Sequence, residues 1–129
     1  MPKTKQFSIT VDNQPGAAAH IVKALGDSKV NILALLGTAQ GTGGTVQFVA
    51  EDAKKAKKAL DAAHIPYQET PAELRELPNK AGALAQTLAA LEKKGVNLSS
   101  IHATALKGGK KAVVVYTVET ATKAATASA

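Results

Sequence analysis

Hydrophobic and polar residues alternate from Gln6 to Asp12, and this period of two predicts a half-buried strand. Asp12 or Asn13 is placed to cap a following helix, and Pro15 suits its first turn. Apolar residues then recur at spacings of three and four, which predicts a helix with one apolar stripe, formed by Ala18, Ile21, Val22 and Leu25. The pattern therefore opens with a strand and an amphipathic helix.

A hairpin is predicted next. Val30 to Gln40 is apolar through Leu36 and predicts a second strand. Gly41-Thr42-Gly43-Gly44 has the composition of a turn, and Thr45 to Ala50 predicts a third strand. Because these glycines lead into a strand and not into a helix, they do not fit a phosphate-binding loop.

The first half ends with a helix and a strand. Glu51 to Ala63 predicts the helix, with acidic residues at its start, where they suit the helix dipole. His64 to Thr70 predicts a short fourth strand, in which Pro66 is tolerated at a sheet edge. The order β-α-β-β-α-β predicts an α+β, ferredoxin-like fold.

The second half of the chain repeats the first. Asn13-Gln14-Pro15-Gly16 and Asn79-Lys80-Ala81-Gly82 each precede an apolar helical stretch, and Val30-Asn31-Ile32 and Val96-Asn97-Leu98 each follow one. Both pairs are separated by 66 positions. Such a repeat predicts two tandem units, residues 1–70 and 71–129, which are small enough that we expect them to share buried surface.

The second unit is predicted to begin with the same order of elements as the first unit. Leu74 to Leu77 predicts a short strand, Val96 to Leu106 and Ala112 to Val118 predict a hairpin, and Thr120 to Ala127 resembles the start of a last helix. A helix stripe is predicted at Leu84, Leu88 and Leu91. The offset grows to 68 between Glu51 and Glu119, so the turn at 107–111 should be about two residues longer. We expect this unit to be truncated after that helix, and open sheet edges to favour a homodimer.

The ordered pattern resembles the ACT domain. An apolar strand, Asn-x-Pro-Gly, a helix and a Val-Asn-Ile strand start occur in that order, and most of the pattern recurs in the second unit. The resemblance covers nearly the whole chain as two copies without a catalytic domain. It implies an amino-acid-sensing regulatory protein that is not an enzyme, with a possible partner enzyme or regulator.

The resemblance also implies a ligand site where two ACT units meet. In the family this site uses the first strand-to-helix turn and the start of the second strand. The positions that correspond in this sequence are Asn13, Gln14, Pro15, Gly16, Asn31, Ile32, Asn79, Lys80, Gly82 and Asn97. The second unit departs from the motif at Ala81, where the family has proline, so its turn should be less rigid.

The residue types suit a small zwitterion. A helix N-terminus has unsatisfied N–H groups that attract a carboxylate, and Gly16 would allow a ligand close to the backbone. The amide of Asn31 offers a donor and an acceptor near an ammonium group. A purely structural role is the alternative, because Asn13 could cap the helix and Asn31 or Asn97 could bond its own backbone.

Composition narrows the other possibilities. The 129 residues are 45% hydrophobic and include no cysteine, which excludes disulfides, cysteine zinc sites and a thiol nucleophile, and fits a reducing cytoplasm. The start has no signal-peptide pattern, and no apolar run is long enough to span a membrane. The three histidines lack metal-ligand spacing, so we expect no metal and no cofactor.

Two other functions remain open. The chain could be a protein-interaction module without a ligand. Nucleic-acid binding would use the net charge of +6, much of it from Lys54, Lys55, Lys57 and Lys58, although a solvated helix face is the favoured explanation of these lysines. RNA-recognition domains share the fold and stack bases on aromatic residues, for which this chain offers only Phe48 and Tyr116 at matching positions.

Overall fold

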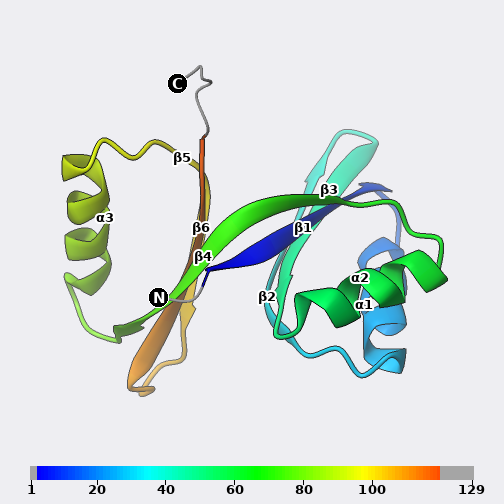
Figure 1. The fold of residues 1–129 in the computed structure, drawn as a ribbon, viewed down its shortest axis with the longest axis horizontal. Helices are drawn as coiled ribbons and strands as arrows, with labels where there is room; N and C mark the ends of the chain where they lie inside the picture. The colour runs from blue at the N-terminus through cyan, green and yellow to red at the C-terminus, as the bar shows by residue number, and fades with distance from the viewer. Residues whose placement is uncertain (1–2, 120–129) are drawn as a thin grey trace. The chain divides into compact units, whose positions relative to one another are not determined.

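The computed structural model describes residues 3–119 (Figure 1). The elements in chain order are β1 (Lys3–Asp12), α1 (Ala17–Asp27), β2 (Ile32–Gln40), β3 (Gly43–Ala50), α2 (Ala53–Ala62), β4 (Gln68–Pro78), α3 (Ala83–Lys93), β5 (Leu98–Ala105) and β6 (Lys111–Val118). They form two compact units. The N-terminal unit is Thr4–Thr70, and the C-terminal unit begins at Pro71 and includes Lys3. None of the helices within residues 3–119 combines the length and apolar character that a membrane crossing requires.

The N-terminal unit has the predicted order β-α-β-β-α-β. Its strands lie in the order β2-β3-β1, and β4, which begins in this unit, follows β1. The pairs are antiparallel, and Phe48 of β3 lies opposite both Phe7 of β1 and Leu35 of β2. This is the strand order of a ferredoxin-like sheet.

One hydrophobic core joins the sheet of this unit to its two helices. The rings of Phe7 and Phe48 stack with centroids 5.1 Å apart, and Tyr67 packs edge-on against Phe7 at 5.6 Å. The helices add fully buried side chains to the same cluster, namely Ile21, Leu25, Ala56 and Leu60. Each large buried side chain contributes roughly 1.5–3 kcal/mol to folding, so this cluster is the main source of the unit's stability.

The loop between β2 and β3 is shorter than the turn predicted at residues 41–44. Gln40 pairs with Gly43, so the loop is only Gly41 and Thr42, while Gly43 and Gly44 belong to β3. A Cβ at Gly44 would lie 2.5 Å from the backbone oxygen of Thr38. Gly44 is therefore needed for a close approach between the two strands, and not for a turn.

The C-terminal unit has strands in the order β4-β6-β5 and one described helix, α3. Tyr116 of β6 lies opposite Glu73 of β4 and Ile101 of β5. The chain between β5 and β6 spans residues 106–110, so this loop is longer than the loop between β2 and β3, as predicted. The predicted last helix, Thr120 to Ala127, lies outside the described residues.

The strand boundaries near the middle of the chain differ from the prediction. The strands expected at 64–70 and 74–77 are one strand, β4, and the predicted unit boundary falls inside it. His64 instead adopts a left-handed φ of 57° after α2, and the amide of Ile65 donates to the carbonyl of Leu60. Pro71 lies within β4, because its fixed φ is compatible with an extended chain and only one amide donor is lost.

Candidate functional site

The turn of residues Asn13–Gly16 joins β1 to α1. Gly16 is the N-cap of α1 and has a left-handed φ of 87°, with no side-chain cap. The expectation that Asp12 or Asn13 caps this helix is therefore wrong, because the helix begins too late for either residue. Pro15 likewise precedes the first turn. The Asn13 side chain instead donates from Nδ2 to the carbonyl of Gly41 at 3.0 Å, which ties the turn to the β2–β3 loop.

The corresponding turn of the C-terminal unit, Asn79–Gly82, has the same construction. Gly82 is the N-cap of α3 with a φ of 89° and no side-chain cap. The Asn79 side chain donates to the carbonyls of Leu106 and Gly109 at 3.1 and 2.8 Å. Lys80 is exposed. Both asparagines thus hold a turn against a hairpin loop, a role that the sequence did not indicate.

A depression of about 390 Å³ lies at the start of α1. Its walls include Gln14, Pro15, Gly16 and His20 from the turn and helix, and Ile65 from the chain after α2. A Cβ built on Gly16 would meet nothing within 4 Å, so the space in front of the glycine is open. The N–H group of Ala17 donates to the carbonyl of Gln14 at 3.3 Å. Because no side chain caps α1, the remaining N–H groups of its first turn can donate to an anionic group. His20, one of the three histidines without metal-ligand spacing, also lies on this wall.

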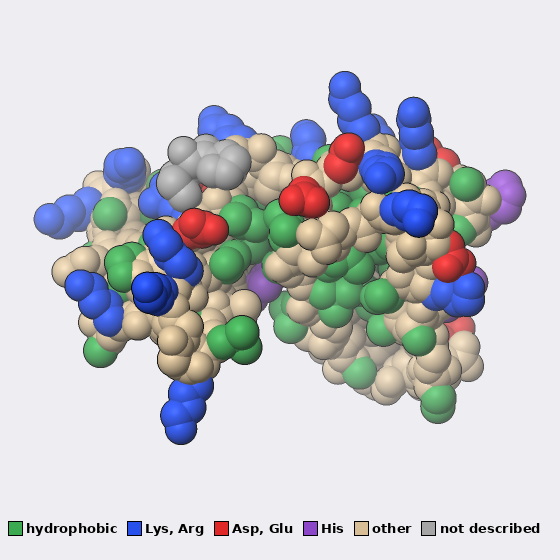
Figure 2. All heavy atoms as spheres, turned by 90° about the horizontal axis from the view of Figure 1, so that it is seen from below, with side chains coloured by type: hydrophobic (Ala, Val, Ile, Leu, Met, Phe, Trp, Pro, Cys, Tyr) green, Lys and Arg blue, Asp and Glu red, His purple; other side chains and the backbone are tan. Residues whose placement is uncertain are grey.

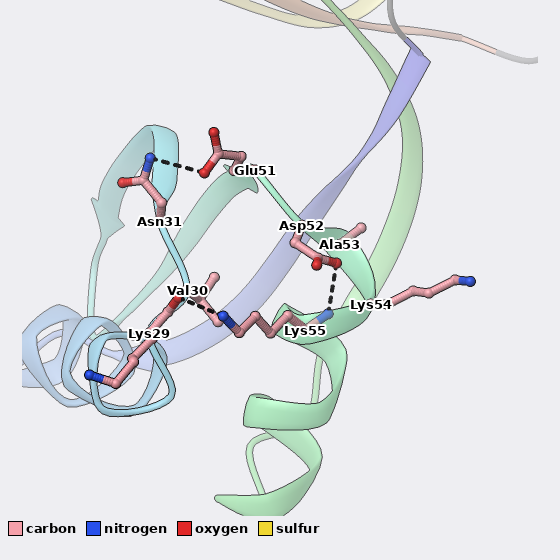
Figure 3. A pocket seen from close by; sticks show the side chains of 8 residues that line it. All are labelled: Lys29, Val30, Asn31, Glu51, Asp52, Ala53, Lys54 and Lys55. Atoms are coloured by element: carbon pink, nitrogen blue, oxygen red, sulfur yellow. Dashed lines mark hydrogen bonds between the residues drawn. The ribbon is translucent and has the colours of Figure 1, made fainter.

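Asn31 lies on a second depression, of about 550 Å³, between the start of β2 and the start of α2 (Figure 3). Its Nδ2 is 3.5 Å from Oε1 of Glu51, and the amide of Glu51 donates to the carbonyl of Asn31 at 2.8 Å. Lys55 reaches across to the carbonyl of Lys29 at 3.2 Å. The carboxylate of Glu51 and the amide oxygen of Asn31 are suitable acceptors for an ammonium group.

Backbone bonding at Asn31 recurs at Asn97. The amide of Glu119 donates to the carbonyl of Asn97 at 2.7 Å, which matches the Glu51–Asn31 bond. Ile32, beside Asn31, is half-buried and packs against the core. The recurrence of asparagine therefore accompanies a recurring backbone contact, which involves the carbonyl group and not the asparagine side chain.

The structure does not bring the predicted site residues of one unit together. The Asn13–Gly16 turn precedes α1 and Asn31 follows it, and the two line different depressions. The 11 residues of α1 separate them by about 16 Å at 1.5 Å per residue. A molecule the size of an amino acid cannot contact both in one unit.

The aromatic residues considered for RNA stacking are not displayed. Phe48 is 0% exposed and Tyr116 is 1% exposed, so neither offers a free ring to a base. Basic side chains are spread over the face shown in Figure 2, with acidic ones between them. On α2, Lys57 pairs with Glu69 at 3.1 Å, and this contact raises the pKa of Lys57.

The hydroxyl groups of Ser99 and Ser100 on β5 are used in contacts between neighbouring strands. The hydroxyls of Ser99 and Ser100 both bond to the Thr117 hydroxyl. Burial lowers the pKa of His102, and neither of its ring nitrogens has a hydrogen-bond partner among residues 3–119. The part of the chain that the structure describes contains no group of three or more potential metal ligands.

Several solved structures resemble this chain. Protein BT0572 from Bacteroides thetaiotaomicron matches with a TM-score of 0.80 and 28% identity over 91% of this chain and 80% of that one. The ligand-free regulatory subunit of aspartate kinase from Thermus thermophilus matches with a TM-score of 0.66 and 18% identity, over 89% and 82%. The same subunit from Thermus flavus matches with a TM-score of 0.59 and 17% identity, over 89% and 82%.

No family model matches the chain, and no curated protein matches it significantly. The structural matches show that the chain has a mixed α/β, ACT-like fold.

Proposed function

We propose that this protein is a regulatory protein of two tandem ACT-like units that senses a free amino acid and is not an enzyme. The observation that carries the proposal is the open depression at the start of α1, where a left-handed glycine leaves the helix without a side-chain cap. The fold is shared with regulatory subunits of aspartate kinase, which supports a regulatory role. We expect a cytoplasmic protein that acts on a partner enzyme or regulator.

The α-carboxylate of the ligand would accept hydrogen bonds from the N–H groups of the first turn of α1 that follow Ala17, beside Gln14 and His20. The ammonium group requires an acceptor, and Asn31 with Glu51 provides one at the other end of the helix. Since one unit cannot offer both ends to one ligand, the second half of the site would come from Asn31 of another copy in a homodimer. The side chain of the ligand would lie against Ile65 and Pro66.

A thermal-shift screen of the twenty amino acids tests this function. A ligand at a hundredfold excess over its Kd stabilises the native state by about 2.7 kcal/mol. We expect one amino acid, or a few related ones, to raise the Tm. No shift with any of them, in a folded sample, would contradict the proposal.

A pair of glycine variants then locates the site. Gly16→Asn adds a side chain in the depression, and asparagine tolerates left-handed backbone, so the unit should stay folded. We expect this variant to lose the ligand-induced rise in Tm. Gly82→Asn is the matched control with the same backbone geometry, and it should keep the rise. Equal loss in both variants would mean that both turns bind, and retention in both would place the ligand elsewhere.

A ligand-free interaction module is the second candidate. It is favoured by the asparagines, because hairpin carbonyls already occupy the Nδ2 groups of Asn13 and Asn79. In that case the screen would give no shift, and the search would turn to protein partners.

A further inference from the structure

Two segments of the C-terminal unit meet beside the start of β6, namely the Asn79–Gly82 turn and the loop between β5 and β6. The side chain of Asn79 donates to the carbonyls of Leu106 and Gly109 at 3.1 and 2.8 Å. Its backbone amide donates to the carbonyl of Lys110 at 3.0 Å. Within the loop, the amide of Gly109 donates to the carbonyl of Leu106 at 2.8 Å. These hydrogen bonds hold the loop against the turn.

Four lysines gather at this junction without an acidic residue among them. Lys80 belongs to the turn, Lys107 and Lys110 belong to the loop, and Lys111 begins β6. All four are exposed, and none forms a salt bridge within residues 3–119. Because like charges repel one another, an uncompensated cluster of this kind favours an anionic partner.

The lysines of α2, which the sequence made the first candidates for anion binding, are largely compensated. Residues 51–62 contain four lysines and three acidic residues, a net charge of +1. Lys57 also pairs with Glu69 at 3.1 Å. The junction in the C-terminal unit therefore has more uncompensated positive charge, although its lysines come from two segments that are distant in the sequence.

Leu106 lies next to Lys107 and is the most exposed large apolar residue that the structure describes. It is 81% exposed, and the next in order, Leu33, is 44% exposed. Every residue from Ala103 to Lys111 is exposed, so this end of the hairpin projects into solvent. The junction therefore presents an apolar side chain together with positive charge on a projecting surface.

Neither the charge nor the exposed leucine is required by the fold, because the N-terminal unit builds the same junction without them. Asn13 forms the corresponding bonds from its turn to the loop between β2 and β3. At the repeat offset of 66, Gln14 corresponds to Lys80. Gln40 corresponds in the same way to Leu106, and no charged residue occurs in that turn or that loop. The lysines and the leucine therefore indicate a role outside folding.

We propose that this junction binds an anionic lipid surface. We call it the Leu106 surface, and it consists of Leu106, Lys80, Lys107, Lys110 and Lys111. Lysine acts as a flexible point charge that attracts anionic headgroups without a fixed geometry. Leu106 would enter the boundary between headgroups and acyl chains, as apolar side chains of surface-bound segments do. This interaction goes beyond the proposed amino-acid site, which lies at the start of α1 in the N-terminal unit.

The residues favour a lipid surface over other anionic partners. A nucleic acid would use the lysines but not the leucine, since bases stack on aromatic rings, and Tyr116, the aromatic residue of this unit, is 1% exposed. An acidic peptide binds where a groove or pocket receives its side chains, whereas the Leu106 surface projects. A lipid surface accepts both the charges and the projecting apolar side chain.

Residues 120–129 provide no counter-charge for this surface. They contain one lysine and no acidic side chain. They follow the end of β6 that is remote from the loop, since Val118 lies about 24 Å from Lys111 at about 3.4 Å per residue. Figure 1 shows the two ends of β6 at opposite ends of this unit. A chain that ends at Glu119 should therefore bind lipid as the full-length protein does.

Co-sedimentation with lipid vesicles tests the proposal on the full-length protein. The vesicles contain phosphatidylcholine alone, or phosphatidylcholine mixed with the anionic lipid phosphatidylserine. We expect binding to the mixed vesicles only. Raising the salt from about 0.1 to about 1 M shortens the Debye length from about 10 to about 3 Å, and should abolish this binding.

Lysine variants separate this surface from general charge attraction. Each lysine near an anionic membrane contributes about fivefold to binding, so Lys107→Gln combined with Lys110→Gln should weaken it about 25-fold. Lys93→Gln combined with Lys94→Gln removes the same charge at the far end of α3, about 16 Å from its start. Binding by this control should stay within about twofold, because the distance exceeds the Debye length. Circular dichroism verifies that each variant is folded.

A single tryptophan reports whether position 106 enters the lipid. The chain contains no tryptophan, so the tryptophan emission of Leu106→Trp arises only from that position. We expect its emission maximum to move to shorter wavelength on the mixed vesicles, because tryptophan settles at the membrane interface. Gln40→Trp, at the corresponding position of the N-terminal unit, is the matched control and should show no change.

No co-sedimentation with the mixed vesicles would overturn the proposal, and so would equal weakening by the two pairs of lysine variants. Binding only by the chain that ends at Glu119 would do the same, because residues 120–129 would then cover the surface. Binding of Leu106→Trp without a wavelength shift would also contradict it, because the lysines would then act alone. Binding of double-stranded DNA instead of vesicles, with the same dependence on Lys107 and Lys110, would assign the surface to a nucleic acid.

Discussion

At the scale of single residues, the two units place different residue types at the same left-handed backbone position. Lys29, after α1, has a left-handed φ of 61°, and the corresponding residue after α3 is Gly95 with a φ of 73°. This conformation costs a residue with a Cβ roughly 1–2 kcal/mol, whereas for glycine the main cost is the chain entropy that it loses on folding. The N-terminal unit therefore carries a strain that the C-terminal unit avoids.

Lys29→Gly should stabilise the protein by about 0.5–1 kcal/mol, measured by urea denaturation, because it removes this strain at the cost of some chain entropy. The bond from Lys55 to the carbonyl of residue 29 does not need the Lys29 side chain. Gly95→Lys is the reciprocal variant and should destabilise. A loss of stability in Lys29→Gly would show that the lysine side chain contributes more than its backbone costs.

His102 should make stability depend on pH. Burial lowers its pKa in the folded state, so the unfolded chain binds the proton more tightly. The contribution of neutral His102 to folding stability is therefore fully present above the unfolded pKa of about 6.5. It is lost as the pH falls through the folded pKa. His102→Leu should flatten the dependence of the unfolding free energy on pH in this range. An unchanged pH dependence in His102→Leu would contradict this explanation.

The candidate site shows what residue patterns can and cannot predict. Asn13 and Asn79 were correctly placed in strand-to-helix turns, and Gly16 in a tight one. Their hydrogen-bond partners, Gly41 and Leu106, lie 28 and 27 positions away in sequence. Such contacts depend on how the hairpin loop folds back onto the turn, so a local pattern cannot reveal them. Whether these residues bind a ligand stays a prediction.

At the scale of elements, β2 is the outer strand of the N-terminal sheet and has no charged residue in Ile32–Gln40. Leu33, Leu35 and Leu36 are 44%, 40% and 37% exposed. An uncharged apolar edge offers free backbone groups and apolar surface to another strand. The homodimer that we propose would use this edge.

Leu36→Lys should convert this dimer to a monomer, because a charge on an edge strand opposes pairing. Light scattering after gel filtration would follow the change from twice the monomer mass of 13.2 kDa. Val22→Lys, at an equally exposed apolar position on α1, is the control and should stay dimeric. A monomeric wild-type protein would contradict the prediction at once.

Element types were predicted more reliably than their ends. The alternation of Phe7, Ile9 and Val11 identified β1, and the apolar stripe identified α1, because both patterns are local. The start of α1 was misjudged because Asn13 resembles a cap, while the left-handed Gly16 begins the helix three residues later. The strand β4 was predicted as two short strands, because the boundary between the two repeat units was placed at residue 70, inside the continuous strand.

At the scale of the whole molecule, the internal repeat was the most useful signal. The constant offset of 66 predicted corresponding turns, and its increase to 68 predicted the longer loop before β6. The same repeat concealed differences in the chemistry of corresponding positions. Phe7 and Ile9 in one unit become Glu73 and Arg75 in the other, and only the structure shows that these charged residues form a cluster with Tyr116.

Because β4 runs through the boundary between the two units, it limits where the chain can be divided for separate expression. Gln68, Glu69 and Thr70 belong to the N-terminal unit, and the remainder of the strand to Pro78 belongs to the C-terminal unit. A cut at residue 70 would give each fragment a severed strand with a new charged terminus in the middle of a sheet. Fragments for separate expression should therefore overlap, and both should carry all 11 residues of Gln68–Pro78.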